Sequence, residues 1–221
     1  MLVPRRPGWD RHSAPLGLEG NAEAALGVLD RAAAARAVVV GHSLGAAVAA
    51  WLGAAHADRI AALILVAPSA NTKSLVPLDH VLAAPVVGDL LCAASLAGAG
   101  TALAADVVRR ATCRWLQVDP GYLRSSARLL LEPATWRAFA AEQRMLVREL
   151  PLLEERLAAI TSPTTIVAGA ADRIVPLQSA RRLSAQIPGA SLTVLDHGHH
   201  LLHQQRPREV AEIIARAAAG S

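Results

Sequence analysis

A serine that can act as a nucleophile stands at position 43, in the Gly-His-Ser-Leu-Gly sequence of residues 41–45. The apolar residues 38–40 before it predict a buried strand, and the Ala-rich residues 44–55 after it predict a helix. So tight a strand–turn–helix crossing strains the serine backbone, and side chains at positions 41 and 45 would clash across the turn. We predict Ser43 as a catalytic nucleophile and the Leu44 N–H as an oxyanion-hole donor. The alternative is a glycine-rich turn with an incidental serine.

A serine hydroxyl needs a base to remove its proton, and the base needs a carboxylate to orient it. Asp172 follows the predicted strand of residues 164–168 through Gly-Ala-Ala, which puts it at the same edge of the sheet as Ser43. We predict Asp172 as this acid. A turn aspartate paired with Arg173 is the alternative. Asp196, directly after the last predicted strand, competes for the role but lies too close in sequence to the histidines that it would orient.

The base is expected among four histidines, at positions 197, 199, 200 and 203, that follow the last predicted strand. A metal site is the alternative for so many histidines, but the nearest carboxylates belong to separate elements. Ser43, Asp172 and a histidine near position 200 occur in the chain order Ser…Asp…His, which is one of the orders used by catalytic triads.

The elements that must position these residues alternate along the chain. Short β-branched runs are separated by Ala- and Leu-rich helical stretches, a pattern typical of an α/β protein with a mostly parallel sheet flanked by helices. Strands are predicted at residues 37–40, 60–66, 164–168 and 191–195, and helices at residues 21–35, 44–55, 177–187 and 207–219. Asn21 is the expected N-cap of the first helix, with Glu23 in its first turn.

The alternation is interrupted between residues 72 and 160. No convincing strand appears there, and helical segments are punctuated by prolines at positions 77, 85, 120, 133 and 151. We predict that residues 72–160 form a helical cap, or lid, inserted into an α/β core made of residues 1–71 and 161–221.

Taken together, these motifs resemble the α/β-hydrolase superfamily, specifically the cap-bearing serine hydrolases of esterase and lipase type, over nearly the whole chain. Residues 6–13 look like the loop after the family's fourth strand, and residues 169–176 look like the segment around its acid. In relatives the catalytic histidine follows a glycine and precedes a helix-starting proline by seven positions. His200 has that distance to Pro207, whereas His199 follows Gly198. The resemblance favours His200 as the base, with His199 as the alternative.

The resemblance implies a serine hydrolase that cleaves a carboxylic ester or related acyl substrate through an acyl-enzyme. Ser43 would attack the carbonyl, His200 would relay the proton, and Asp172 would orient the imidazole. The apolar content of the cap suggests an apolar substrate moiety, although packing within the cap is the alternative use of most of these residues. No metal or organic cofactor is implied. Acyl transfer or carbon–carbon bond hydrolysis by the same triad is an alternative, as is a non-catalytic remnant.

The front of the chain departs from the family pattern. Relatives begin with about three further strands and a His-Gly-rich oxyanion loop, and nothing in the sequence supplies that loop. We therefore expect an N-terminally truncated hydrolase in which the strand at residues 37–40 is an exposed edge that allows self-association. A missing second oxyanion donor would lower turnover by about 10²–10³-fold.

Composition narrows the remaining classes of function. The chain has 221 residues, a formal net charge of +4 and a single lysine, Lys73, without a basic stripe, which argues against nucleic-acid binding. Cys92 and Cys113 are the only cysteines and are expected to be buried free thiols. The uncharged stretch of residues 90–105 is shorter than the ~20 residues of a membrane span. With no signal-peptide pattern at the N-terminus, we expect a cytoplasmic protein.

Overall fold

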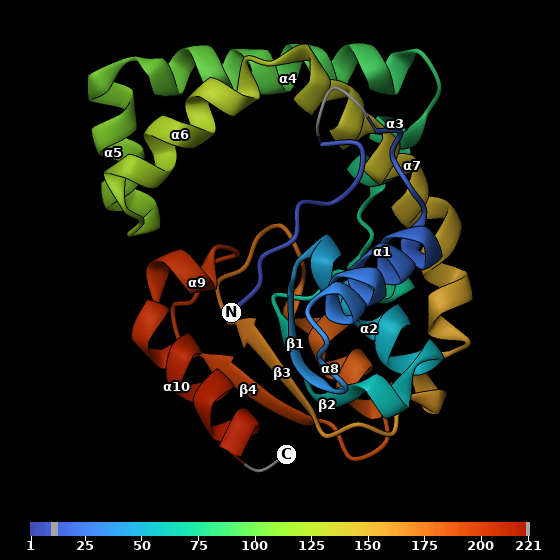
Figure 1. The fold of residues 1–221 in the computed structure, drawn as a ribbon. Helices are drawn as coiled ribbons and strands as arrows, with labels where there is room; N and C mark the ends of the chain where they lie inside the picture. The colour runs from blue at the N-terminus through green and yellow to red at the C-terminus, as the bar shows by residue number, and fades with distance from the viewer. Residues whose placement is uncertain (10–12, 220–221) are drawn as a thin grey trace.

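The structure is a computed structural model that describes residues 1–9 and 13–219 (Figure 1). Four strands form one parallel sheet in the order β1-β2-β3-β4. They are β1 (Ala37–His42), β2 (Ile60–Val66), β3 (Thr164–Gly169) and β4 (Ser191–Leu195). The predicted fold class, a parallel sheet flanked by helices, is confirmed. Because the strands are parallel, the loops that follow them all meet at one edge of the sheet.

Helices cover both faces of the sheet. The elements are α1 (Leu18–Arg31), α2 (Leu44–Ala55), α8 (Leu177–Gln186), α9 (Leu202–Gln205) and α10 (Pro207–Ala219). Alternate residues of β2 pack on opposite faces of the sheet. Leu63 and Leu65 lie in the hydrophobic cluster that includes residues of α2 and α8, whereas Ile64 lies in the cluster that includes residues of α10. A strand buried on both sides must be apolar throughout, which is why β2 reads Ile-Ala-Ala-Leu-Ile-Leu-Val.

We call residues 72–160, between β2 and β3, the cap. Its helices are α3 (Pro77–Ala83), α4 (Val87–Ala104), α5 (Asp106–Leu116), α6 (Pro120–Leu130) and α7 (Pro133–Glu154). Short 3-10 turns lie in the cap at Thr72–Ser74 and Leu157–Ala159, and a third lies in the core at Ala57–Arg59, before β2. Figure 1 shows α4 along the top of the cap, α5 turning down at one end, α6 running back beneath α4, and α7 returning to the core at the other end.

Prolines begin three cap helices, but one prediction about them is wrong. Pro77, Pro120 and Pro133 each take the first helical position, where no N–H is needed. Pro151 was expected to punctuate the helices, yet it lies inside α7. Leu150 and Leu153 beside it are fully buried, and this packing outweighs the hydrogen bond that the proline cannot make.

The first helix also differs from its prediction. α1 begins at Leu18, after the N-cap Gly17, so Asn21 lies inside the helix instead of capping it. The reason is a tertiary contact: the Leu18 N–H donates to Glu149 Oε2 of α7 at 2.6 Å, so the helix needs no local capping side chain. The Asn21 amide instead donates to the carbonyl oxygens of Leu16 and Gly17 at 2.8 Å.

Two apolar features remain exposed. β1 lies at the edge of the sheet, and within the described residues it pairs only with β2, leaving Val40 45% exposed. Among residues 1–9 and 13–219, α4 is the one helix long and apolar enough to cross a membrane by length and composition, and 17% of it is buried. Its inner side packs against α6 and α7, so α4 is part of the framework of the cap.

Candidate active site

The turn between β1 and α2 has the strained geometry that its sequence predicts. Ser43 has φ +53° and ψ −123°, a conformation that costs energy for any residue other than glycine. The next strand holds this turn in place, because the Ser43 N–H donates to the carbonyl oxygen of Val66 at 3.0 Å. The Ser43 carbonyl accepts from the N–H of Ser69 at 3.2 Å and from that of Ala46 at 2.9 Å.

The two glycines of the motif have different roles. A Cβ at Gly41 would lie 2.3 Å from the carbonyl oxygen of Gly45 and 2.6 Å from the Cα of Ala46, so only glycine fits there. The predicted clash at position 45 is wrong. A Cβ at Gly45 would meet nothing closer than Nη1 of Arg6 at 3.9 Å, because this position faces away from the crossing.

The structure brings Ser43, His200 and Asp172 into one hydrogen-bonded chain. His200 Nε2 lies 3.0 Å from Ser43 Oγ, and His200 Nδ1 lies 2.9 Å from Asp172 Oδ2. The carboxylate only accepts, so Nδ1 carries the proton, and Nε2 is left free to accept a proton from the serine hydroxyl. The side chains of His200 and Asp172 are 11% and 2% exposed, which shields this chain of bonds from water.

Asp172 is held as an ionised carboxylate. It lies in the loop after β3, where Oδ1 accepts the N–H groups of Ile174 at 2.8 Å and Val175 at 3.0 Å. Burial acts to raise the pKa of Asp172, but the hydrogen bond and charge of His200 and these two backbone N–H groups outweigh it and leave the pKa below its ordinary value. Asp172 therefore stabilises its own turn through Oδ1 and, through Oδ2 at 2.9 Å from His200 Nδ1, has the geometry of an orienting acid.

We call residues 196–201, between β4 and α9, the histidine loop. The other candidates in this loop do not contact Ser43 or Asp172 through the hydrogen bonds described above. His199 Nδ1 lies 3.3 Å from the carbonyl oxygen of Ala171, and the His199 ring faces Trp115 with the centroids 6.2 Å apart. It is His200, the residue favoured by its distance to Pro207, that lies between serine and acid. Asp196 is exposed, and its backbone carbonyl, not its carboxylate, contacts Arg206.

The oxyanion donor predicted at position 44 lies at the start of a helix. Leu44 is the first residue of α2, so its N–H is among those that have no acceptor within the helix. The helix dipole adds partial positive charge at this end. An oxygen anion next to Ser43 would therefore meet a donor and a favourable field.

Sequence reasoning missed the role of one histidine at this site. His42 directly precedes the serine, and its Nε2 lies 2.9 Å from the carbonyl oxygen of His200. Its ring also packs on those of His200 and His203, with centroids 5.0 Å and 4.5 Å apart. The only signal was the position of His42 beside Ser43, and the contact with His200 spans 158 residues.

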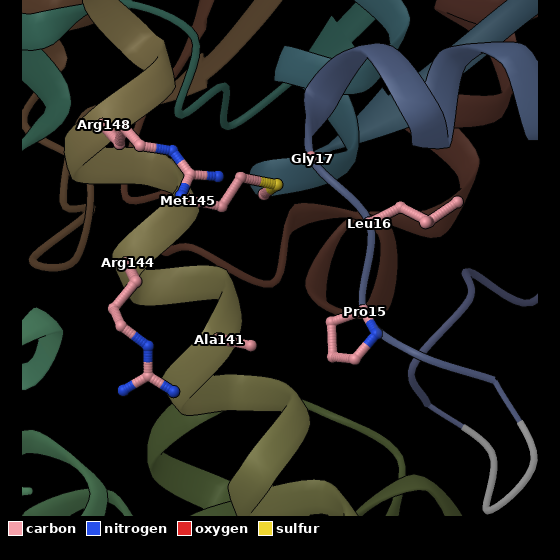
Figure 2. Close-up of a pocket in the computed structure, with 7 residues that line it drawn as sticks. All are labelled: Pro15, Leu16, Gly17, Ala141, Arg144, Met145 and Arg148. Carbon is pink, nitrogen blue, oxygen red and sulfur yellow. The ribbon is translucent and has the colours of Figure 1, made fainter. Parts of the chain in front are cut away.

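Two small hollows lie away from this chain of bonds. The first, of about 190 Å³, is shown in Figure 2: Met145 and Arg148 of α7 face Pro15, Leu16 and Gly17 at the start of α1. The second, of about 200 Å³, lies between α4, α5 and α6. Neither is lined by a residue of the Ser43 site, and both are smaller than the roughly 300–1,000 Å³ of a typical ligand pocket. We assign substrate to neither.

A parallel sheet flanked by helices, with a serine on a strained strand–helix turn and a histidine and an aspartate bonded to it in series, defines the α/β-hydrolase class. The sequence profile of the Alpha/beta hydrolase family matches residues 1–213, and the chain belongs to that family. It is 31% identical over 227 residues to Lipase LipV of Mycobacterium tuberculosis, a match that covers 97% of this chain and 79% of LipV.

Solved structures agree on the fold. The enol-lactonase from Burkholderia xenovorans LB400 has a TM-score of 0.70 at 21% identity, covering 97% of this chain and 78% of that chain. The meta-cleavage product hydrolase CumD from Pseudomonas fluorescens IP01 has a TM-score of 0.73 at 17% identity, covering 99% and 79%. Family membership and the similarity to LipV support hydrolase activity for this chain.

Proposed function

We propose that this chain is a serine hydrolase that cleaves a carboxylic ester or related acyl substrate, with Ser43, His200 and Asp172 as its catalytic triad. The observation that carries the proposal is the placement of His200, 3.0 Å from the hydroxyl of Ser43 and 2.9 Å from the carboxylate of Asp172. A serine hydroxyl is a weak nucleophile, and this arrangement is the one that activates it.

The proposed reaction has two halves. Ser43 Oγ attacks the carbonyl carbon while His200 Nε2 takes the hydroxyl proton, and the Leu44 N–H stabilises the oxyanion. The bond to the leaving alcohol then breaks as His200 returns the proton to that oxygen, which leaves an acyl-serine. Water then attacks the acyl carbon while the same nitrogen takes its proton. The bond to Ser43 Oγ breaks as His200 returns that proton to Oγ, which releases the acid and restores the hydroxyl. Asp172 stays ionised throughout and stabilises the imidazolium each time it forms.

An apolar acyl or alcohol group is the proposed substrate moiety. The cap that stands over this edge of the sheet is rich in Leu, Val and Ala, with Leu90, Val107 and Trp115 more than 60% exposed. The name of LipV, a lipase, agrees with an apolar ester substrate. Acyl transfer and carbon–carbon bond cleavage would use the same triad, and no residue of the site favours them over hydrolysis.

A serine-directed fluorophosphonate probe tests the proposal. Folded protein should be labelled, Ser43→Ala should not be labelled, and Asp196→Asn, a matched change outside the triad, should be labelled like the unmodified chain. A series of p-nitrophenyl esters from acetate to dodecanoate should be hydrolysed, with Ser43→Ala lowering kcat by about 10⁴–10⁶-fold. A folded chain that neither reacts with the probe nor hydrolyses any ester would establish the non-catalytic alternative.

A further inference from the structure

Three imidazole rings pack together next to Ser43. His42, the last residue of β1, lies between His200 of the histidine loop and His203 of α9. The ring centroids of His42 and His200 are 5.0 Å apart, and those of His42 and His203 are 4.5 Å apart in an edge-on arrangement. The ring of the proposed base is therefore packed against that of a second histidine.

The polar contact of His42 defines its tautomer. His42 Nε2 lies 2.9 Å from the backbone carbonyl oxygen of His200. A carbonyl oxygen can only accept, so this nitrogen carries a hydrogen and donates it. The bond ties the strand that ends in the nucleophile to the backbone of the residue that carries the base, although the two residues are 158 positions apart.

The surroundings of His42 keep its ring uncharged. The pKa of His42 is lowered to about 4, mainly by burial and in smaller part by positive charge on His200 and His203. The hydrogen bond to the His200 carbonyl and the charge of Asp172 act in the opposite direction and do not compensate. The pKa of His203 is also lowered, first by burial and then by the charge on His200.

We propose that His42 is a positioning residue for His200, holding its backbone through the Nε2–H bond and backing its ring with a neutral, water-excluding imidazole. The catalytic meaning of this role rests on the proposed function. Neutrality matters because His200 becomes an imidazolium during each proton transfer, and a second cation 5.0 Å away between ring centroids would oppose that charge. Position matters because a displacement of about 1 Å at a reacting group can cost about 10²-fold in rate.

Two substitutions separate the hydrogen bond from ring packing. His42→Phe keeps a ring but has no donor, and His42→Gln keeps an N–H at the place of Nε2. We expect His42→Phe to lower kcat for a p-nitrophenyl ester by about 10–100-fold with KM changed less than about twofold, since the base is displaced and not the substrate. His42→Gln should recover kcat to within about fivefold, and His80→Phe, a change at an exposed cap histidine, should have no effect.

Two outcomes would overturn the proposal. One is an unchanged kcat in His42→Phe. The other is an equal loss of kcat in His42→Phe and His42→Gln together with an equal fall in Tm, which is the behaviour of a residue that only supports the fold.

Histidine NMR keeps this inference separate from the proposed function. In ¹⁵N-labelled unmodified chain, His42 should show the Nε2–H tautomer and stay neutral until the pH approaches about 4. Titration of His42 at an ordinary histidine pKa, or an Nδ1–H tautomer, contradicts the inference whether or not the chain hydrolyses esters. Conversely, a chain that does not react with the fluorophosphonate but shows this tautomer would refute the catalytic triad and leave the contact between His42 and His200 standing.

Discussion

The α/β core and the cap are built from the same few apolar residue types but bury them differently. In the core, β2 is enclosed by helices on both faces, and residues such as Leu63 and Ile64 are fully buried. In the cap, Leu90 is 67% exposed and Val107 is 73% exposed, because single helices offer each other only one side. A sheet presents two faces to its neighbours, so the same composition yields a rigid core in one region and an open framework in the other.

The candidate active site belongs to the core. Ser43, Asp172 and His200 all come from loops at the carboxyl edge of the core sheet, whose strand spacing fixes their separation. Within the described residues, the cap contacts the loop that carries His200. The ring of Trp115 in α5 faces that of His199, and Gln117, after α5, accepts a hydrogen bond from Gln205 at 3.1 Å. Gln205 in turn accepts the N–H of His199 at 2.7 Å. We infer that the core sets the chemistry and that the cap adjusts the histidine loop.

The largest effect is expected from a polar change in the core. Asp172→Asn should keep the fold but offer His200 an amide in place of a charge, which removes the stabilisation of the imidazolium and permits the wrong tautomer. A loss of about 10⁴-fold in kcat is expected, as for other triads. Asp196→Asn, 24 positions further along the chain in the next loop, should keep full activity. Equal activity of the two variants would show that Asp172 is not the acid.

Substituting glycine by alanine, which adds one methyl group, should change the free energy of unfolding in opposite directions in the two regions. Gly41→Ala places a Cβ 2.3 Å from a backbone oxygen in the core, and we expect a loss of about 3 kcal/mol or more in the free energy of unfolding. Gly98→Ala, in α4 of the cap, places its Cβ where nothing lies within 4 Å, and should stabilise the chain by up to about 1 kcal/mol through helix propensity. Urea denaturation measures both, and similar losses would mean that the cap is as tightly packed as the core.

The contacts that join the cap to the core are expected to lose stability as the pH falls. Glu154, at the end of α7, accepts hydrogen bonds from Thr72 at 2.6 Å and from Gln186 at 2.5 Å. These bonds join the first residue of the cap and the end of its last helix to α8 of the core. Burial raises its pKa, but these bonds and that from Arg182 outweigh it and lower the pKa of Glu154 to about 2 from 4.5. A carboxyl whose pKa is lower in the folded state stabilises the fold above its unfolded value, and this contribution is lost as the pH falls from about 4.5 to about 2.

Glu154→Gln should therefore lower the free energy of unfolding by about 1–3 kcal/mol at pH 7 and reduce the fall of Tm between pH 4.5 and pH 2. Glu155→Gln, at the exposed neighbouring position, is the matched control and should behave like the unmodified chain. An unchanged acid profile in Glu154→Gln would show that this carboxylate does not join the cap to the core.

The smallest effect is expected where the cap touches the histidine loop. Gln117→Ala removes one exposed hydrogen bond to Gln205 and should lower kcat/KM by about two- to fivefold, with no change in Tm beyond about 1 °C. Gln178→Ala, on the exposed side of α8, should have no effect. A fall of 100-fold or more in the kcat/KM of Gln117→Ala would mean that the cap contributes directly to catalysis. It would refute the inference that the core alone sets the chemistry.

Much of this architecture is encoded locally. The order of strands and helices and the ends of α2 and β2 follow from short patterns of apolar residues, and the strain at Ser43 follows from a turn between a strand and a helix that are adjacent in the chain. Because parallel strands end at one edge, the sequence also indicates that Ser43, Asp172 and a histidine near position 200 lie together.

Contacts between distant segments decided the rest. The start of α1 depends on Glu149, and the choice of His200 over His199 depends on where the loop after β4 packs. The role of His42 depends on a partner 158 positions away, and that of Glu154 depends in part on Thr72, 82 positions away. Residue types and short patterns along the chain are enough to identify the side chains that could do chemistry and the edge of the sheet on which they lie. Which of these side chains meet depends on tertiary packing, because hydrogen bonds of about 3 Å are set by contacts between elements and not by spacing along the chain.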